Sequence, residues 1–177
     1  MSRAFVKEDS GDRPDDTPER RSSGLPNYVT PDGKAALRRR VSELEETFRE
    51  LRKTRTGDPL HTQRLRAAER DLLYYEHRLK TAVLVDNSGC GAAEARFGAL
   101  VSARDGDGTL YRFHIVGEDE ADPDTGKISW ASPLASALLG TGPGAYISWE
   151  KQTGGTKLEI VSIDYPGGGP QAKPPAP

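Results

Sequence analysis

The stretch from residue 35 to residue 82, AALRRRVSELEETFRELRKTRTGDPLHTQRLRAAERDLLYYEHRLKTA, decides the fold of this 177-residue chain. Apolar residues recur in its first half at steps of three and four, and the same spacing returns in its second half. The two sets are Leu37, Val41, Leu44, Phe48 and Leu51, then Leu65, Ala68, Leu72, Tyr75, Leu79 and Ala82. Each set makes a narrow apolar stripe on one helix face, so each half predicts an amphipathic helix.

The two helices are expected to pair as an antiparallel coiled-coil hairpin over residues 27–82. Thr30-Pro31 is a helix start, because the hydroxyl can cap free N–H groups and proline needs no partner there. Gly57 and Pro59 interrupt the pattern, which places the tip near residues 54–62. Two helices of a compact bundle are the alternative. A projecting hairpin is preferred, because the stripes are narrow and the chain offers no third helix of that length.

After residue 82 the pattern changes to short strands, which predicts a small antiparallel sheet with one helix and an α+β fold. Residues 83–95 are expected to be a linker, with a short strand or link at 83–85, and 96–166 the second domain. Its expected elements are strands at 96–103, 110–116, 128–130, 145–149 and 157–165, and a short helix at 133–139. Residues 1–26 and the Gly/Pro-rich 167–177 are expected to be disordered tails.

Charge is uneven along the chain. Residues 34–80 carry 13 basic and 8 acidic side chains, whereas residues 81–177 carry 7 basic and 12 acidic ones. This asymmetry indicates either a polyanionic or polarised partner or a salt-bridged, solvated helix, with equal weight. No apolar run of about 18 residues predicts a membrane span, and the N-terminal residues lack the apolar region of a secretory signal.

No catalytic constellation is evident in the sequence. Cys90, the single cysteine, lies in a glycine-rich linker, and His61, His77 and His114 fall in different elements. Nucleophilic catalysis needs such groups in mutual reach, and no phosphate-binding glycine motif or Cys/His metal spacing occurs. The acidic run at 118–124 lacks the ligand spacing of an EF-hand. The residues alone therefore predict a binding protein.

Three stretches carry a resemblance to a known family: IVGEDEADP at 115–123, GKIS at 126–129 and SPLASALLG at 132–140. YVTPDG at 28–33 adds a fourth. Together with the order of parts, they resemble the Gre family of bacterial transcript cleavage and elongation factors, over about residues 27–166. The resemblance implies an FKBP-like second domain without isomerase activity.

The resemblance also implies a function as a cytoplasmic, monomeric transcription elongation factor without membrane contact. In this family the second domain docks on DNA-bound RNA polymerase, and the hairpin enters the secondary channel toward the RNA 3′ end. Acidic tip residues then help hold a Mg²⁺ shared with the polymerase, which cleaves backtracked RNA. The resemblance therefore implies that this chain binds no cofactor by itself and is not an enzyme on its own. Two metals in such a site stabilise the attacking and leaving oxygens.

The tip departs from the family pattern, which has an Asp and, three residues later, a Glu. Asp58 matches the Asp, but His61 stands in place of the Glu. Asp58 is thus a weak metal candidate, since Mg²⁺ prefers several oxygen ligands and neutral imidazole suits it poorly. The second arm is also about one heptad shorter than the family pattern. Basic residues instead surround the tip and are expected either to contact RNA or polymerase or to be solvated: Lys53, Arg55, Arg64 and Arg66.

The resemblance places polymerase docking on the second domain, at Glu118, Asp119, Glu120, Asp122, Ser129, Ser132 and Pro133. The structural alternative is that Ser132 caps the short helix and that the carboxylates are solvated. Trp130 and Trp149 are expected to be core residues. Four functions stay open: a cleavage-stimulating elongation factor, a non-cleaving channel regulator, a nucleoside diphosphate kinase regulator and a prolyl isomerase.

Overall fold

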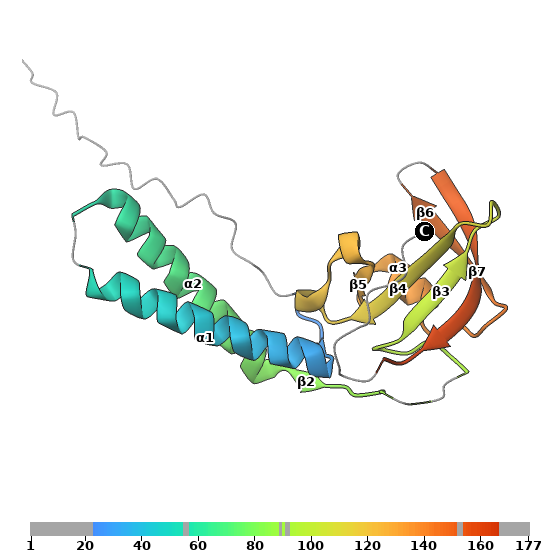
Figure 1. Cartoon of the computed structure of the whole chain (residues 1–177), viewed down its shortest axis with the longest axis horizontal. Coiled ribbons are helices and arrows are strands. Elements are labelled where there is room, and N and C mark those ends of the chain that lie inside the picture. The colour runs from blue at the N-terminus through green and yellow to red at the C-terminus, as the bar shows by residue number, and fades with distance from the viewer. Residues whose placement is uncertain (1–22, 55–56, 89, 91–92, 152–153, 167–177) are drawn as a thin grey trace, which may run out of the picture.

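The computed structural model describes residues 23–54, 57–88, 90, 93–151 and 154–166. The expected tails fall almost wholly outside this part of the chain, and so does Arg55. Figure 1 shows an elongated molecule in which a helical hairpin projects from a small sheet unit. The projecting arrangement confirms the prediction from the narrow apolar stripes.

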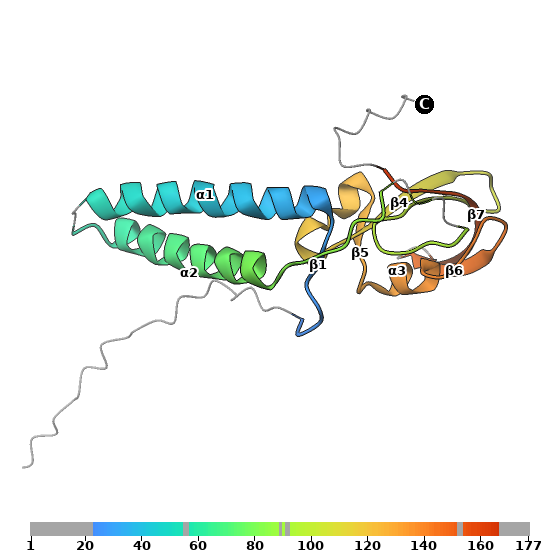
Figure 2. The same cartoon turned by 90° about the horizontal axis from the view of Figure 1, so that it is seen from below.

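The hairpin consists of α1 (Pro31–Lys53) and α2 (Pro59–Thr81), which lie side by side in both views (Figures 1 and 2). Thr30 caps α1 by accepting a hydrogen bond from the Gly33 N–H, and Pro31 is the first helical residue. The first stripe is buried at Leu37, Val41 and Leu44, and α2 contributes the buried Ala68. With 23 residues in each arm, the hairpin reaches ~35 Å at 1.5 Å per residue.

A two-stranded parallel ribbon closes the base of the hairpin. β1 (Tyr28–Val29) runs before α1, β2 (Val83–Leu84) follows α2, and the two pair in register. The sequence analysis left 83–85 open between strand and link and did not predict β1. The ribbon holds the two ends of the hairpin together where the chain passes to the sheet unit.

The second unit is a five-stranded sheet with the order β5-β4-β3-β7-β6. Its strands are β3 (Leu100–Arg104), β4 (Leu110–Val116), β5 (Lys127–Ser129), β6 (Tyr146–Lys151) and β7 (Gly154–Asp164). All five expected strands are present. The first begins at residue 100 instead of 96, because Gly98 adopts a φ of +83° in a turn just before it.

One strand pair contradicts the expected antiparallel sheet. β4 and β5 pair in parallel, with His114 opposite Lys127 and Val116 opposite Ser129. Parallel neighbours need a crossover connection. Here the acidic loop supplies it through two short 3-10 helices, Glu118–Glu120 (η1) and Pro123–Thr125 (η2), and returns the chain to the same sheet edge.

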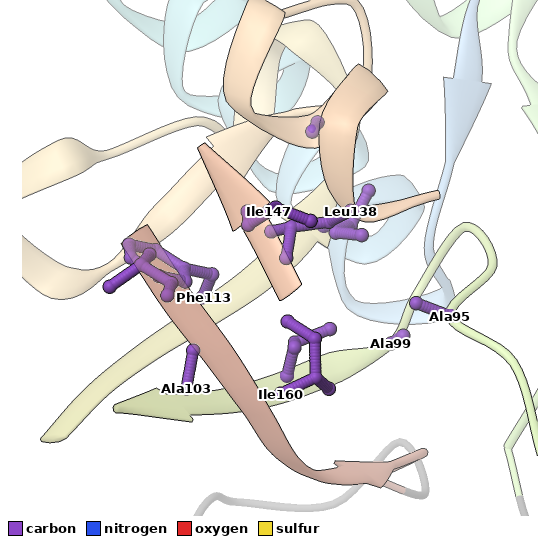
Figure 3. Packing of buried hydrophobic residues seen from close by; sticks show 11 residues of the cluster. Ala95, Ala99, Ala103, Phe113, Leu138, Ile147 and Ile160 are labelled. Atoms are coloured by element: carbon purple, nitrogen blue, oxygen red, sulfur yellow. The ribbon is translucent and has the colours of Figure 1, made fainter. Parts of the chain in front are cut away.

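The core of the sheet unit lies between the sheet and α3 (Pro133–Leu138). Ile115, Leu138, Leu158 and Ile160 are among its buried side chains, and Figure 3 shows Leu138 facing Ile147 across the core. The sequence predicts alternation at Phe97, Ala99 and Val101; Ala99 and Val101 are fully buried, and Phe97 is half-buried. The sheet unit therefore has a hydrophobic core of its own, and none of its described residues belongs to the hairpin helices.

Candidate functional site

The tip of the hairpin is held by the residues that the family resemblance associates with a metal. The Asp58 carboxylate caps α2, accepting a hydrogen bond of 3.0 Å from the Leu60 N–H. Pro59 then starts the helix without needing a backbone partner. Asp58 therefore has a defined structural role at the α2 N-terminus.

His61 joins the two arms just behind the tip. Its Nε2 lies 3.1 Å from the carbonyl oxygen of Leu51, near the C-terminal end of α1, and in the matching tautomer it donates a hydrogen bond there. The last carbonyls of a helix have no intrahelical partner, so this contact satisfies one of them. The position where the family has a carboxylate thus holds an imidazole that ties α1 to α2.

These tip residues do not fit a Mg²⁺ site. One carboxylate that caps a helix and one imidazole bonded to a carbonyl are a poor donor set for an ion that needs several oxygen ligands. Over the described part of the chain, no group of three or more His, Cys, Asp or Glu side chains is placed to hold a metal ion. The tip residues alone therefore do not make up a metal site.

Three of the four predicted basic residues lie in the described part of the tip region. Lys53 pairs with Glu50 at 2.6 Å, and the hydrogen bond and charge of Lys53 lower the pKa of that carboxyl. Arg64 and Arg66 are exposed on the first turns of α2. Exposed pairs such as Lys53–Glu50 are weak, so these cations stay open to an anionic partner.

The acidic loop, by contrast, turns three carboxylates toward the base of the hairpin. Arg78 of α2 is only 3% exposed and donates to Asp119 at 2.5 Å and to Glu118 at 3.2 Å. Tyr74 donates its hydroxyl proton to Asp119 at 2.8 Å. Burial lowers the pKa of Arg78, but the hydrogen bond and charge of Asp119 outweigh burial and raise it. Burial, and then the bond to Asp119, raise the pKa of Tyr74 to about 12.

Glu120 makes a second contact, at the N-terminus of α1. Its carboxylate accepts hydrogen bonds from the Thr30 N–H at 2.9 Å and from the Thr30 hydroxyl. The Gly117 N–H also donates to it at 3.3 Å. A carboxylate is favoured at this end of a helix because the free N–H groups carry partial positive charge. Glu118, Asp119 and Glu120 therefore join the hairpin to the sheet unit.

The remaining predicted docking residues lie around a hollow beside α3. Ser129, Ser132 and Pro133 line it, with apolar surface from Ile128, Leu134 and Trp149. Asp122 is exposed at the start of η2, next to Ala121 and Pro123, which also line the hollow. Ser132 accepts a hydrogen bond from the Ala135 N–H, so its predicted capping role is confirmed.

Both tryptophans pack against the core, as predicted. Trp149 stands edge-on to Tyr111 and Phe113 with ring centroids 5.3 Å away, and Trp130 meets Tyr28 at 5.1 Å. The contact of Trp130 is one that the sequence analysis missed, because Tyr28 belongs to the hairpin end of the chain. Arg78 was missed as well. The sequence feature that could have indicated a buried Arg78 is its position directly before Leu79, a residue of the second apolar stripe.

The fold and these sites define a two-part protein: a basic helical arm is joined by charged contacts to a small sheet unit with a partly apolar hollow. The comparisons with known proteins identify the family to which such a chain belongs. The family model "Transcription elongation factor, GreA/GreB, C-term" matches residues 91–165. The chain is 33% identical to "Transcription elongation factor GreB" of Neisseria meningitidis serogroup A, over 81% of this chain and 97% of that protein.

A further relative is "Transcription elongation factor GreA" of Roseiflexus sp., 34% identical over 80% of this chain and 99% of that protein. The chain therefore belongs to the GreA/GreB family of transcription elongation factors. Among solved structures, Gfh1 of Thermus thermophilus aligns at 25% identity over 78% of this chain and 99% of that one, with a TM-score of 0.38. GreA/GreB from Nitrosomonas europaea aligns at 24% identity over 78% and 98%, with a TM-score of 0.40.

These TM-scores are too low to compare the arrangement of whole chains, so the family assignment rests on the sequence relatives. The FKBP-like fold of the sheet unit stays a prediction. In the described residues no helix is both long enough and apolar enough to cross a membrane.

Proposed function

We propose that this chain acts on RNA polymerase during elongation by docking its sheet unit and inserting the hairpin into the secondary channel, without delivering a metal ion. The structure of the hairpin tip is the observation that supports the absence of metal delivery. Asp58 caps α2 and His61 bonds to α1, so the residues in the two family positions hold the hairpin together.

The first half is supported by family membership and by the shape of the chain. The ~35 Å arm has the slender form that entry into a channel requires, and its basic tip residues suit RNA phosphates or carboxylates of the polymerase. The hollow lined by Ser129, Ser132 and Pro133, with Asp122 at its side, is the proposed docking surface. Its lining combines apolar and polar side chains, as protein-binding surfaces do.

In this proposal the chain is a regulator and not an enzyme. The polymerase keeps its own catalytic centre and its own Mg²⁺, and the inserted hairpin changes access to that centre. A tip without a carboxylate pair occupies the channel, so we expect slower entry or exit of the RNA 3′ end and altered pausing.

The test is the RNA length in a purified backtracked polymerase complex, followed over time with and without the protein. Slower shortening than the intrinsic rate of the polymerase supports a non-cleaving regulator. Faster shortening of the RNA refutes the non-cleaving regulator and indicates that the tip helps to hold a metal ion. No change at saturating protein contradicts both polymerase functions, and co-purification with a nucleoside diphosphate kinase would then be the next measurement.

Asp58→Asn is the matched variant for this assay. Asparagine caps helices about as well as aspartate, so the tip keeps its fold while the negative charge is removed. The proposal expects the same effect on RNA shortening from the variant and the wild type. A variant that loses a cleavage-stimulating effect would show that the carboxylate acts on a metal.

A further inference from the structure

Two charged contacts join the hairpin to the sheet unit, and each holds a different helix. At the C-terminal end of α2, Arg78 binds Glu118 and Asp119, and at the N-terminus of α1, Glu120 binds Thr30. We call these two contacts the base clamp. Because the three carboxylates all belong to the three-residue η1, one short turn of the sheet unit contacts both arms.

We propose that Arg78, Asp119 and Glu120 are positioning residues that set the direction in which the hairpin leaves the sheet unit. This inference rests on the proposed function, because the direction decides where the tip lies once the sheet unit is docked. In this inference the carboxylates of Glu118, Asp119 and Glu120 act inside the molecule and not on the partner.

The geometry of the junction supports a need for such a clamp. The Tyr28 ring contacts Trp130 at 5.1 Å and Phe97 at 5.9 Å, which makes an apolar joint between the units. The hydrophobic effect that stabilises such a joint is not itself directional, so the joint fixes the angle between the units less strongly than hydrogen bonds do. The base clamp adds hydrogen bonds on two helices, and such bonds are directional.

The Arg78 end of the clamp is largely shielded from solvent. Arg78 is 3% exposed and Asp119 11%, so water screens their attraction poorly. The Arg78 backbone is held as well, since the Asn27 side-chain amide donates to its carbonyl at 2.7 Å. A guanidinium that binds two carboxylates with different nitrogens has little freedom to reorient.

Glycine at two positions makes room for the second contact. A Cβ on Gly33 would lie 1.9 Å from the Glu120 carboxyl carbon, and one on Gly117 would lie 2.5 Å from the Tyr28 carbonyl oxygen. The backbones of both units thus approach each other closely at Glu120. Asp124, in the same acidic loop, is exposed and lies outside the clamp.

The direction of the hairpin can be measured in the free protein by pulsed EPR. Spin labels at Gln63→Cys near the tip and Arg112→Cys on β4 report the distance between the units, in a Cys90→Ser background. The test variant is Asp119→Asn with Glu120→Gln, and the matched control is Asp124→Asn. Circular dichroism establishes that each variant keeps its helices, and Arg78→Lys tests the clamp from the other side.

We expect a single narrow distribution of the distance between the two spin labels in the wild type and in the control. In the test variant we expect a broad distribution. The test variant is also expected to keep the affinity of the wild type for polymerase and to lose the effect on elongation. An unchanged distance distribution overturns the inference. So does a weakened polymerase affinity with an unchanged distance, which would place the carboxylates on the partner. If the wild type does not bind polymerase, the proposed function fails, and the EPR distances alone decide whether the clamp sets the direction.

Discussion

Gly33→Ala is expected to destabilise this protein, although the same change in a helix normally stabilises it. Alanine is favoured over glycine inside a helix by roughly 0.5–1 kcal/mol. Here the new Cβ would lie 1.9 Å from the carboxyl carbon of Glu120 and 2.1 and 2.4 Å from its oxygens. The carboxylate must therefore leave its place at the N-terminus of α1.

The cost follows from the hydrogen bonds that Glu120 accepts. Thr30 donates two of them, one of 2.9 Å from its N–H and one from its hydroxyl. The Gly117 N–H donates a longer one of 3.3 Å. Bonds to a charged group contribute ~1.5–3 kcal/mol each, and partial exposure favours the lower value for the two Thr30 bonds. After the gain from alanine is subtracted, the expected net loss is about 2 kcal/mol, or ~4–8 °C in Tm.

The sign of the effect should reverse when Glu120 is removed first. In a Glu120→Ala background the clash with the Glu120 carboxylate is gone, so Gly33→Ala is expected to stabilise the protein by roughly 0.5–1 kcal/mol. Urea unfolding followed by circular dichroism at the helix band gives the four free energies of this double-mutant cycle. Stabilisation by Gly33→Ala in both backgrounds would refute the close approach of Glu120 to α1.

Three further predictions concern single side chains. Burial, and then the charge of Lys127, hold the pKa of His114 below 6.5, so the unfolded chain binds a proton that the folded chain does not, and stability falls as the pH drops below that value. His114→Gln should therefore lose less stability than the wild type between pH 7 and pH 5 in urea unfolding, and parallel curves would contradict the lowered pKa. Tyr74 should ionise near pH 12, later than an ordinary tyrosine, so Tyr74→Phe should remove a step near that pH from the alkaline absorbance titration; loss of a step near pH 10 instead would contradict its bond to Asp119. Leu138→Ala should cost ~2–5 kcal/mol because the side chain is fully buried, and a cost under about 1 kcal/mol would show a loosely packed core.

The hairpin was predictable because its evidence is periodic and local. Leu37, Val41 and Leu44 repeat at helical spacing, and all three are buried where the spacing places them. Thr30 and Pro31 marked the start of α1 by capping chemistry that needs no tertiary information. The first strand of the sheet unit was found for the same reason, since alternation at Phe97, Ala99 and Val101 depends only on the side-chain period.

Features that depend on pairing between distant segments were not predictable. β1 and β2 have two residues each, too few to show any period, and they form only because the hairpin brings their ends together. The parallel pairing of β4 and β5 was missed for a related reason. Parallel strands are expected after a helical crossover, whereas here two 3-10 helices make the connection.

The acidic run shows how the same residues support two functions until their partners are known. The sequence shows that Glu118, Asp119 and Glu120 are charged, but it does not show which cation they contact. A cation elsewhere on the same chain and a cation on a partner protein are both possible. That cation is Arg78, 40 residues away, and a buried arginine without carboxylates would be strongly unfavourable. Burial of Arg78 at the base of α2 therefore requires that the carboxylates of the acidic loop face inward, toward α2. Because Arg78 belongs to the hairpin and the acidic loop to the sheet unit, this contact also fixes the direction of the hairpin relative to the sheet unit.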